Sequence, residues 1–276
     1  MRAAAILPCL VLATFVPGVA LADVEAIRAE DNSVWLAAGA SHLNYSEFAD
    51  GGDNIDTERG WLPSIAGGFS MLGGQPGSVF PRNLYLALDF SADFGDLRYN
   101  GGLLDGTPYN GSTDETIWTV RGRAGYAFQL GTQALLIPFA QLGYRAWDRE
   151  LSDVQNEEYR NIDVTGGLLA QYAPTPKTVL SLWGAVGETV AGEMTAHTLG
   201  NRMDFDLGDK ITWTAGVKAG YWFWPHIELF TRISYDRLSY GRSQDVATSI
   251  PGLFFYEPNS DTDTITSQFG IAYNFQ

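Results

Sequence analysis

The C-terminal segment constrains the fold more than any other part of this sequence. From residue 264 to residue 275, apolar and polar residues alternate along the chain. One face would carry Ile265, Phe269, Ile271, Tyr273 and Phe275, and the other Thr264, Thr266, Gln268, Gly270 and Asn274. Successive side chains of a β-strand point to opposite sides of its sheet. The pattern therefore predicts a strand that separates two different environments.

The same period of two recurs along the rest of the chain. The expected strands cover residues 33–45, 61–71, 83–95, 115–129, 134–147, 159–172, 178–190, 210–224, 226–240 and 262–275. The clearest case is 210–224, where one face carries Ile211, Trp213, Val217, Tyr221 and Phe223. Its other face carries Thr212, Thr214, Gly216, Lys218 and Gly220. The apolar row is expected to meet lipid and the polar row a lumen.

The connections between these segments alternate in length. Compact connectors lie at 73–77, 130–133, 173–177 and Pro225, whereas the others are long, polar and acidic, such as 50–54 and 148–158. Short periplasmic turns and long extracellular loops are typical of outer-membrane barrels. We therefore predict an all-β fold, a transmembrane antiparallel up-and-down β-barrel of about ten strands, within a range of about 8–12. A soluble periplasmic sheet protein is the alternative.

The first 22 residues predict export. Arg2 is followed by an apolar core, and Ala20-Leu21-Ala22 form a small-x-small cleavage site. We expect a cleaved signal peptide at 1–22 and one barrel domain at 23–276. Cys9, the only cysteine, lies inside this signal, so disulfides and cysteine-ligated metals are excluded from the mature chain.

Composition excludes several other classes of protein. No run of 18 apolar residues follows residue 22, which excludes a helical membrane protein. The net charge of −15 would repel the phosphates of nucleic acid, so no nucleic-acid partner is expected. No cofactor is implied by the sequence.

Charged residues on the polar faces of the strands are expected to line the lumen. The candidates are Asp89, Arg121, Arg123, Lys218, Glu228, Arg232 and Asp236. Across the turn at Pro225, Lys218 should lie diagonally close to Glu228 or directly opposite Arg232. Opposite charges could pair and fill a narrow interior, because buried charges require partners. They could also form the walls of a small selective channel.

The acidic connectors also have two interpretations. Their carboxylates could simply be solvated at the cell surface. They could instead hold divalent cations that bridge to anionic lipopolysaccharide, since such ions prefer carboxylate oxygens. Aromatic residues near strand ends predict belts at the two lipid–water interfaces, with Trp118, Trp147, Trp213 and Tyr235 at the loop end.

The last strand resembles the signal by which the barrel-assembly machinery recognises its clients, polar-x-Gly-x-x-aromatic-x-aromatic. The matching residues are Gln268, Gly270, Tyr273 and Phe275. The whole mature chain resembles a small Gram-negative outer-membrane β-barrel. This resemblance implies location in the outer membrane, and outer-membrane lipid, lipopolysaccharide and the assembly machinery as partners.

The segment 217–240 also resembles the late hairpin of the ten-stranded omptin proteases. Their catalysis implies paired aspartates facing an Asp–His pair at the loop rim. Here the rim histidines are His42 and His197, and neither has an aspartate two residues before it. His197 has Glu193 nearby in sequence, whereas Asp93 and Asp96 belong to another strand end. His226 is expected in a periplasmic turn.

We therefore expect a protein that is not an enzyme. Its predicted role is structural and at the cell surface, supporting the envelope and presenting acidic loops around a narrow or plugged lumen. A small porin-like channel for ions or small solutes is the alternative, and an omptin-like surface hydrolase is a second one.

Overall fold

The computed structural model describes residues 23–74, 80–102, 107–152, 155–198, 201–247, 252 and 254–275. The predicted signal peptide and its cleavage site lie outside the described residues, as do residues 75–77 of the 73–77 connector. Among the described residues, no helix is long and apolar enough to cross a membrane.

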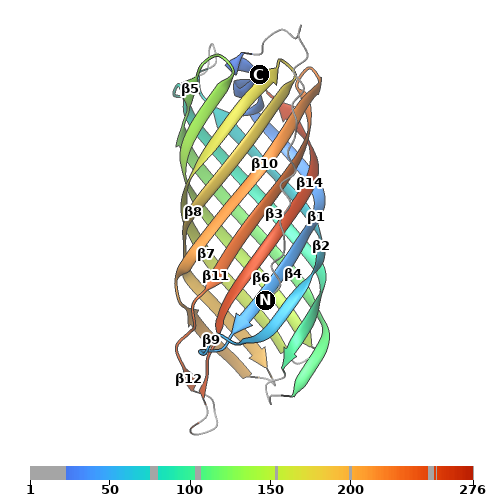
Figure 1. Ribbon diagram of the computed structural model, residues 1–276, viewed down its shortest axis with the longest axis vertical. Helices are drawn as coiled ribbons and strands as arrows, with labels where there is room; N and C mark the ends of the chain where they lie inside the picture. The colour runs from blue at the N-terminus through green and yellow to red at the C-terminus, as the bar shows by residue number, and fades with distance from the viewer. Residues whose placement is uncertain are drawn as a thin grey trace.

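The described chain folds into a closed barrel of ten antiparallel strand positions. The barrel is tall, and its strands are tilted relative to its long axis (Figure 1). The strands are β1 (Ser33–Phe48), β2 (Asn54–Leu72), β3 (Leu84–Gly102), β4 (Pro108–Tyr126), β5 (Phe128–Leu130), β6 (Ala134–Ser152), β7 (Gln155–Thr175), β8 (Thr178–Thr198), β9 (Asn201–Leu207), β10 (Lys210–Trp224), β11 (Ile227–Tyr240), β12 (Val246–Ala247), β13 (Phe254–Phe255) and β14 (Asn259–Asn274). One short helix, α1 (Val24–Glu30), precedes them.

Closure comes from the pairing of the first long strand with the last. β1 pairs with β14 in unbroken antiparallel register from Ser33↔Asn274 to Phe48↔Asn259. β9 and β10 share one strand position, since β9 pairs with residues 192–198 of β8 and β10 with residues 178–189. β5 continues the line of β4 along β6. Each long strand that the structure describes therefore pairs with a neighbour on both sides.

All ten predicted strands are present, and most extend beyond the predicted bounds toward the loop end. β6 continues to Ser152 and β7 begins at Gln155, so most of the connector predicted at 148–158 is paired strand. The prediction of a long loop there was wrong. Ion pairs and aromatic contacts inside the barrel, described below, hold this polar stretch in the sheet.

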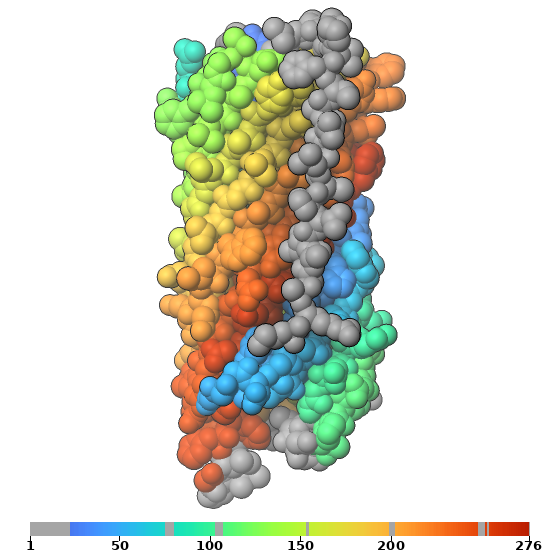
Figure 2. Space-filling view, in the orientation of Figure 1, coloured from blue at the N-terminus to red at the C-terminus, as the bar shows by residue number. Residues whose placement is uncertain are grey.

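The outer face of the wall carries an apolar band. Outward residues such as Leu36, Ile211, Phe223 and Phe269 are 62–68% exposed, whereas the inward Thr212 and Thr214 are 7% exposed. The predicted parity of β10 is thus confirmed. In the space-filling view, side chains of neighbouring strands meet along the visible wall (Figure 2).

A row of outward charges marks the loop-side limit of this band. Its members, all exposed, are Arg59, Asp96, Asp114, Asp148, Arg160 and Glu188. An arginine facing hydrocarbon at mid-depth costs about 2–4 kcal/mol and a carboxylate somewhat less, so we place the limit of the lipid below this row. Strands β7 and β8 contain 21 residues each, about twice the 9–11 that a membrane crossing requires. The barrel wall therefore extends well above the lipid.

The helix α1 closes the turn end of the barrel, a feature that the sequence analysis did not predict. Val24 and Ile27 are buried in an apolar cluster with Leu72, Leu135 and Val179. The helix is tied to the turns, since the Val24 amide donates to the Thr132 carbonyl at 2.8 Å. In Figure 1 it lies at the same end as the C-terminus.

Two polar side chains hold α1 in this position. Arg28 is 5% exposed and donates from Nη1 to the Gly73 carbonyl at 2.6 Å and from Nη2 to Asn83 Oδ1 at 2.9 Å. Asn32 pairs with the backbone of Leu72 through both its amide nitrogen and its oxygen, at 3.0 and 3.2 Å. These bonds satisfy groups that would otherwise be buried without partners.

Candidate functional site: the barrel interior

The seven charged residues predicted to line the lumen all point into the barrel, where they form a polar middle section. Asp89 lies on β3, Arg121 and Arg123 on β4, Lys218 on β10, and Glu228, Arg232 and Asp236 on β11. Their inward direction follows from the pleat, because the alternate residues of these strands, such as Leu88, Val217 and Ile233, are exposed on the outer face.

Lys218 joins the wall to helix α1, which we call the plug because it closes the turn end of the barrel. It lies directly opposite Arg232 across β10–β11, and its Nζ is 2.8 Å from Glu228 Oε1. It also lies 2.8 Å from Oε1 of Glu30, the last residue of α1, and 4.7 Å from the centre of the Phe230 ring. A buried ammonium thus has two carboxylates and an aromatic face around it, which offsets its loss of hydration.

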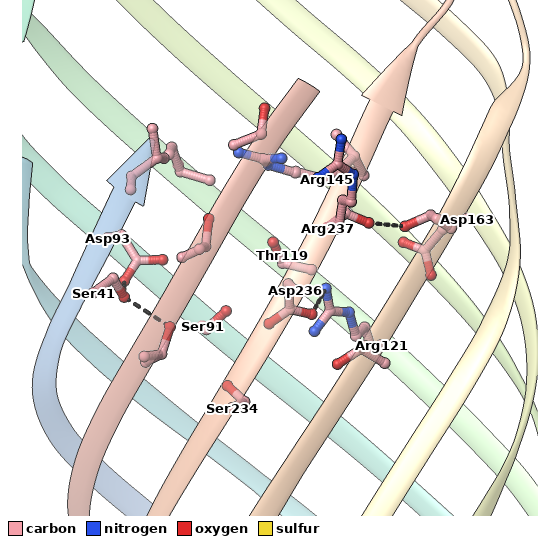
Figure 3. A pocket seen from close by; sticks show the side chains of 18 of the residues that line it. Ser41, Ser91, Asp93, Thr119, Arg121, Arg145, Asp163, Ser234, Asp236 and Arg237 are labelled. Atoms are coloured by element: carbon pink, nitrogen blue, oxygen red, sulfur yellow. Dashed lines mark hydrogen bonds and ion pairs between the residues drawn. The ribbon is translucent and has the colours of Figure 1, made fainter. Parts of the chain in front are cut away.

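The arginines of the middle section are paired in the same way. Arg123 Nη2 lies 3.1 Å from Asp89 Oδ2, and Arg121 Nη2 lies 2.9 Å from Asp236 Oδ1 (Figure 3). Arg232 Nε donates to Gln268 Oε1 at 2.7 Å, and its guanidinium stacks 4.7 Å from the Trp35 ring. The interior charges are therefore held in a fixed network.

Two small cavities remain between these pairs. One, of about 80 Å³, lies among Ser41, Asp93, Arg121, Asp163 and Asp236 (Figure 3). The other, of about 90 Å³, lies among Glu30, Asp89, Arg123 and Lys218. A water molecule needs roughly 10–15 Å³ of such volume, so each cavity has room for a handful of waters.

An aromatic layer lies above the polar middle section, toward the loop end. Trp147 stacks on Tyr159 with ring centres 5.2 Å apart, and Tyr159 stacks on Tyr240 at 5.8 Å. Tyr45 packs edge-on against Trp147 at 5.2 Å, and Leu43, Leu62 and Phe205 complete the cluster. Trp147 is 0% exposed, so its predicted place in the outer aromatic belt was wrong. It faces inward, where it helps to fill the barrel.

A single buried arginine organises the acidic residues above this layer. Arg149 is 1% exposed and lies 2.7 Å from Glu157, 2.9 Å from Glu58 and 3.2 Å from Glu47. Asp56 is 3.6 Å from the same guanidinium. The interpretation of these acids as solvated loop residues was therefore wrong, because they point into the barrel from paired strands.

The alternation of inward and outward residues along the strands could have predicted this cluster from the sequence. Arg145, Trp147 and Arg149 continue the inward row of β6, and Tyr159 and Glu157 continue that of β7. Ending the predicted strands at 147 and 159 concealed the pattern.

The connection between β11 and β14 reaches the same cluster. Glu257 is 7% exposed and accepts a hydrogen bond from Tyr159 at 2.6 Å. Burial raises the pKa of Glu257 well above its ordinary value, and the carboxylates of Glu47 and Glu157 raise it further. Phe255 and Val246 of this connection pack on the aromatic layer. The connection therefore adds to the closure of the loop end.

The residues considered for omptin-like chemistry do not come together. His42 lies on the outer face against Trp61, with ring centres 5.0 Å apart. His197 is also outside, with Nε2 3.6 Å from Glu158. Asp93 points inward and accepts from Ser41 at 2.6 Å. His226 lies in the β10–β11 turn, as predicted.

The C-terminal motif has two faces. Gln268 is 3% exposed and donates to Ser64 Oγ at 2.9 Å, whereas Tyr273 and Phe275 are 55% and 46% exposed toward the outside. Gly270 lies inside, where an added Cβ would clash with the Phe230 ring. Within the described part of the chain, no group of three histidine, cysteine or acidic side chains is arranged to hold a metal ion.

Comparison with known proteins gives the family. The model of the outer membrane protein beta-barrel domain matches residues 9–275. The chain belongs to this family. Its place is the outer membrane, with the lipid around the apolar band. No curated protein matches the sequence.

One solved structure supports the fold. The outer membrane protease OmpT from Escherichia coli is similar with a TM-score of 0.61 at 10% identity, over 89% of this chain and 97% of that one. Neisserial surface protein A is matched with a TM-score of 0.34 at 12% identity, over 88% and 97% of the two chains. At these identities the likeness concerns the fold alone.

Removing the Arg149 charge should destabilise the barrel strongly. In Arg149→Met, several buried carboxylates lose their only cation, which costs about 3–5 kcal/mol. Burial raises the pKa of Glu58 and of Asp56 to about 8, so the difference in stability from wild type should shrink as the pH falls below about 8 and these carboxylates take up protons. Urea unfolding, followed by tryptophan fluorescence, measures the free energy of unfolding of each variant. Arg160→Met, which removes an exposed arginine, is the control; an equal loss in both variants would contradict the assigned role.

Asp31 should make the plug sensitive to alkaline pH. Burial raises the pKa of Asp31 to about 8, with the Glu30 charge adding to the effect. The folded state thus holds this proton more tightly than the unfolded chain, and stability falls as pH rises from about 4 through 8. Asp31→Asn should remove that part of the pH dependence, as thermal unfolding between pH 5 and 9 would show. Asp23→Asn is the control, and identical pH profiles for Asp31→Asn and wild type would refute the assignment.

Proposed function

We propose that this protein is a closed, non-conducting outer-membrane barrel with a structural role at the cell surface. The observation that supports this most is the closure of its interior at both ends. The plug helix and its apolar cluster fill the turn end, and the aromatic layer with the Arg149 cluster fills the loop end.

The middle section fits the same proposal. Its charges are paired within the wall, as Arg123–Asp89 and Arg121–Asp236 show. Its two cavities, of about 80 and 90 Å³, are small compared with an open channel. Ten strands enclose little more space than the eight-stranded barrels whose interiors side chains fill.

The height of the wall suggests which part of the protein contacts other molecules. Strands β6, β7 and β8 extend past the outward charges Asp148, Arg160 and Glu188, so they project above the lipid as paired hairpins. Ion pairs and rings inside the projecting part brace it. Such a rim is a stiff surface for contacts with the envelope or with other molecules.

A narrow porin-like channel is the competing function, and the opposed charges of the middle section favour it. Single-channel recording in planar bilayers separates the two. We expect the refolded protein to give no conductance steps above the leak of bare lipid. Arg28→Ala, which loosens only the plug, should stay silent because the aromatic layer still closes the loop end.

Steps in the wild-type recording would overturn the closed-barrel proposal. A channel would then change its ion selectivity when Arg121 or Arg232 is replaced by Gln. Arg160→Gln, on the outer wall, serves as the control because it would leave the selectivity unchanged.

We also propose that the protein is not an omptin-like hydrolase. His42 and His197 lie on the outer wall, away from the inward Asp93. Incubation with a peptide library and with lipopolysaccharide should yield no cleavage products by mass spectrometry. Cleavage that disappears in His197→Ala would sink this proposal, with His226→Ala as the matched control.

The remaining partners are proposals of the same kind. Gln268, Gly270, Tyr273 and Phe275 would serve recognition by the barrel-assembly machinery. Divalent cations at the acidic loop end would bridge to lipopolysaccharide, with exposed carboxylates such as Asp114 and Asp148 available for this.

A further inference from the structure

Two arginines on the outer wall lack a partner in a strongly acidic protein. Arg59 on β2 and Arg98 on β3 are both exposed and face each other directly across the strand pair. Neither forms an ion pair or a side-chain hydrogen bond with any residue that the structure describes. Like charges placed opposite each other in a sheet are destabilising, so this arrangement needs another reason.

Other arginines on the loop-end surface behave differently. Arg160 contacts Glu158 at 2.8 Å, Arg202 contacts Asp204 at 3.0 Å, and Arg237 contacts Asp261 at 2.6 Å. With 32 acidic residues against 17 basic ones, a carboxylate is available for most cations. The Arg59–Arg98 pair is thus left open to an external anion.

The pair stands at the height of lipid headgroups. Trp61, two residues below Arg59 on the same face, is 63% exposed and packs against His42. Exposed tryptophans of this kind mark the lipid–water interface. Phe94, four residues below Arg98, is 43% exposed and already belongs to the apolar band.

An apolar groove lies on the same part of the wall, deeper in the membrane. It measures about 540 Å³ and is lined by Leu36, Ala38, Ile65, Gly67, Phe269 and Ile271. The small residues Ala38 and Gly67 form its floor between the larger side chains. From Arg59 to Ile65 the strand advances roughly 20 Å, or roughly 15 Å in depth at the usual tilt, which is the thickness of one leaflet.

We propose that Arg59, Arg98 and this groove together bind one lipid of the outer leaflet, a phosphorylated glycolipid of the lipopolysaccharide type. The two guanidinium groups, whose Cβ atoms are about 4.5–5.5 Å apart in such a pair, share one phosphate. Guanidinium offers paired N–H donors that match phosphate oxygens. One acyl chain lies in the groove beneath.

This arrangement differs from cation bridging at the acidic loop end, because the phosphate contacts the protein directly. It also stands independently of whether the barrel conducts, since every residue involved lies on the outer wall.

The test uses the refolded full-length barrel in phosphatidylcholine vesicles containing lipid A, the phosphorylated acyl anchor of lipopolysaccharide. Binding is followed by fluorescence transfer from tryptophan to a labelled lipid A, with EDTA present to remove bridging cations. We expect the Arg59→Gln/Arg98→Gln variant to bind at least about tenfold more weakly, because it loses the charge-assisted hydrogen bonds to the phosphate. Dephosphorylated lipid A should bind to the wild-type protein as weakly as lipid A binds to this variant.

Matched variants separate specific binding from general charge. Arg160→Gln/Arg202→Gln removes the same number of outward positive charges and should bind like wild type. Ala38→Phe fills the groove from the lipid side and should weaken lipid A binding. Inorganic phosphate should not compete at millimolar concentration.

Several results would overturn the proposal. Equal binding by the Arg59→Gln/Arg98→Gln variant and wild type would refute the clamp, and equal binding of the dephosphorylated lipid would refute the phosphate. An unaffected Ala38→Phe variant would refute the groove, and effective competition by inorganic phosphate would make the arginines an anion site without a lipid. Gel mobility of unboiled samples confirms that every variant is folded.

Discussion

Backbone N–H and C=O groups inside hydrocarbon must find their partners within the protein, because lipid offers none. A sheet meets this demand only when its edges are joined, and here the joint is the β1–β14 pairing from Ser33 to Phe48. Every other feature depends on that closure. It creates an inside that is separate from the outside, and it forces each side chain of the wall to face one or the other.

The inside is filled in layers of alternating character. An apolar cluster around α1 is followed by the paired charges of the middle section, then by stacked rings, and then by the Arg149 cluster. Each charged layer lies next to an apolar one, which removes water and strengthens the ion pairs. The same arrangement explains why individual cations such as Lys218 and Arg149 carry several carboxylates each.

Function follows from which surfaces this filling leaves available. With the interior occupied, the outer band and the projecting hairpins are the parts that can meet other molecules. The unpaired Arg59 and Arg98 belong to that outer surface, at the boundary where lipid headgroups lie. The proposed role therefore depends on the outer wall and the rim.

Much of the architecture was determined by the sequence alone. The period of two fixed which side chains face lipid, since a single slip would place Lys218 or Arg121 in hydrocarbon. The turn at Pro225 fixed the register that brings Lys218 near Glu228. Only the tertiary structure decided how the interior is closed. The plug, and the convergence of Glu47, Glu58 and Glu157 on Arg149, join residues from 8 to 188 positions apart. The local pattern shows which way a residue points but not which distant residue it contacts.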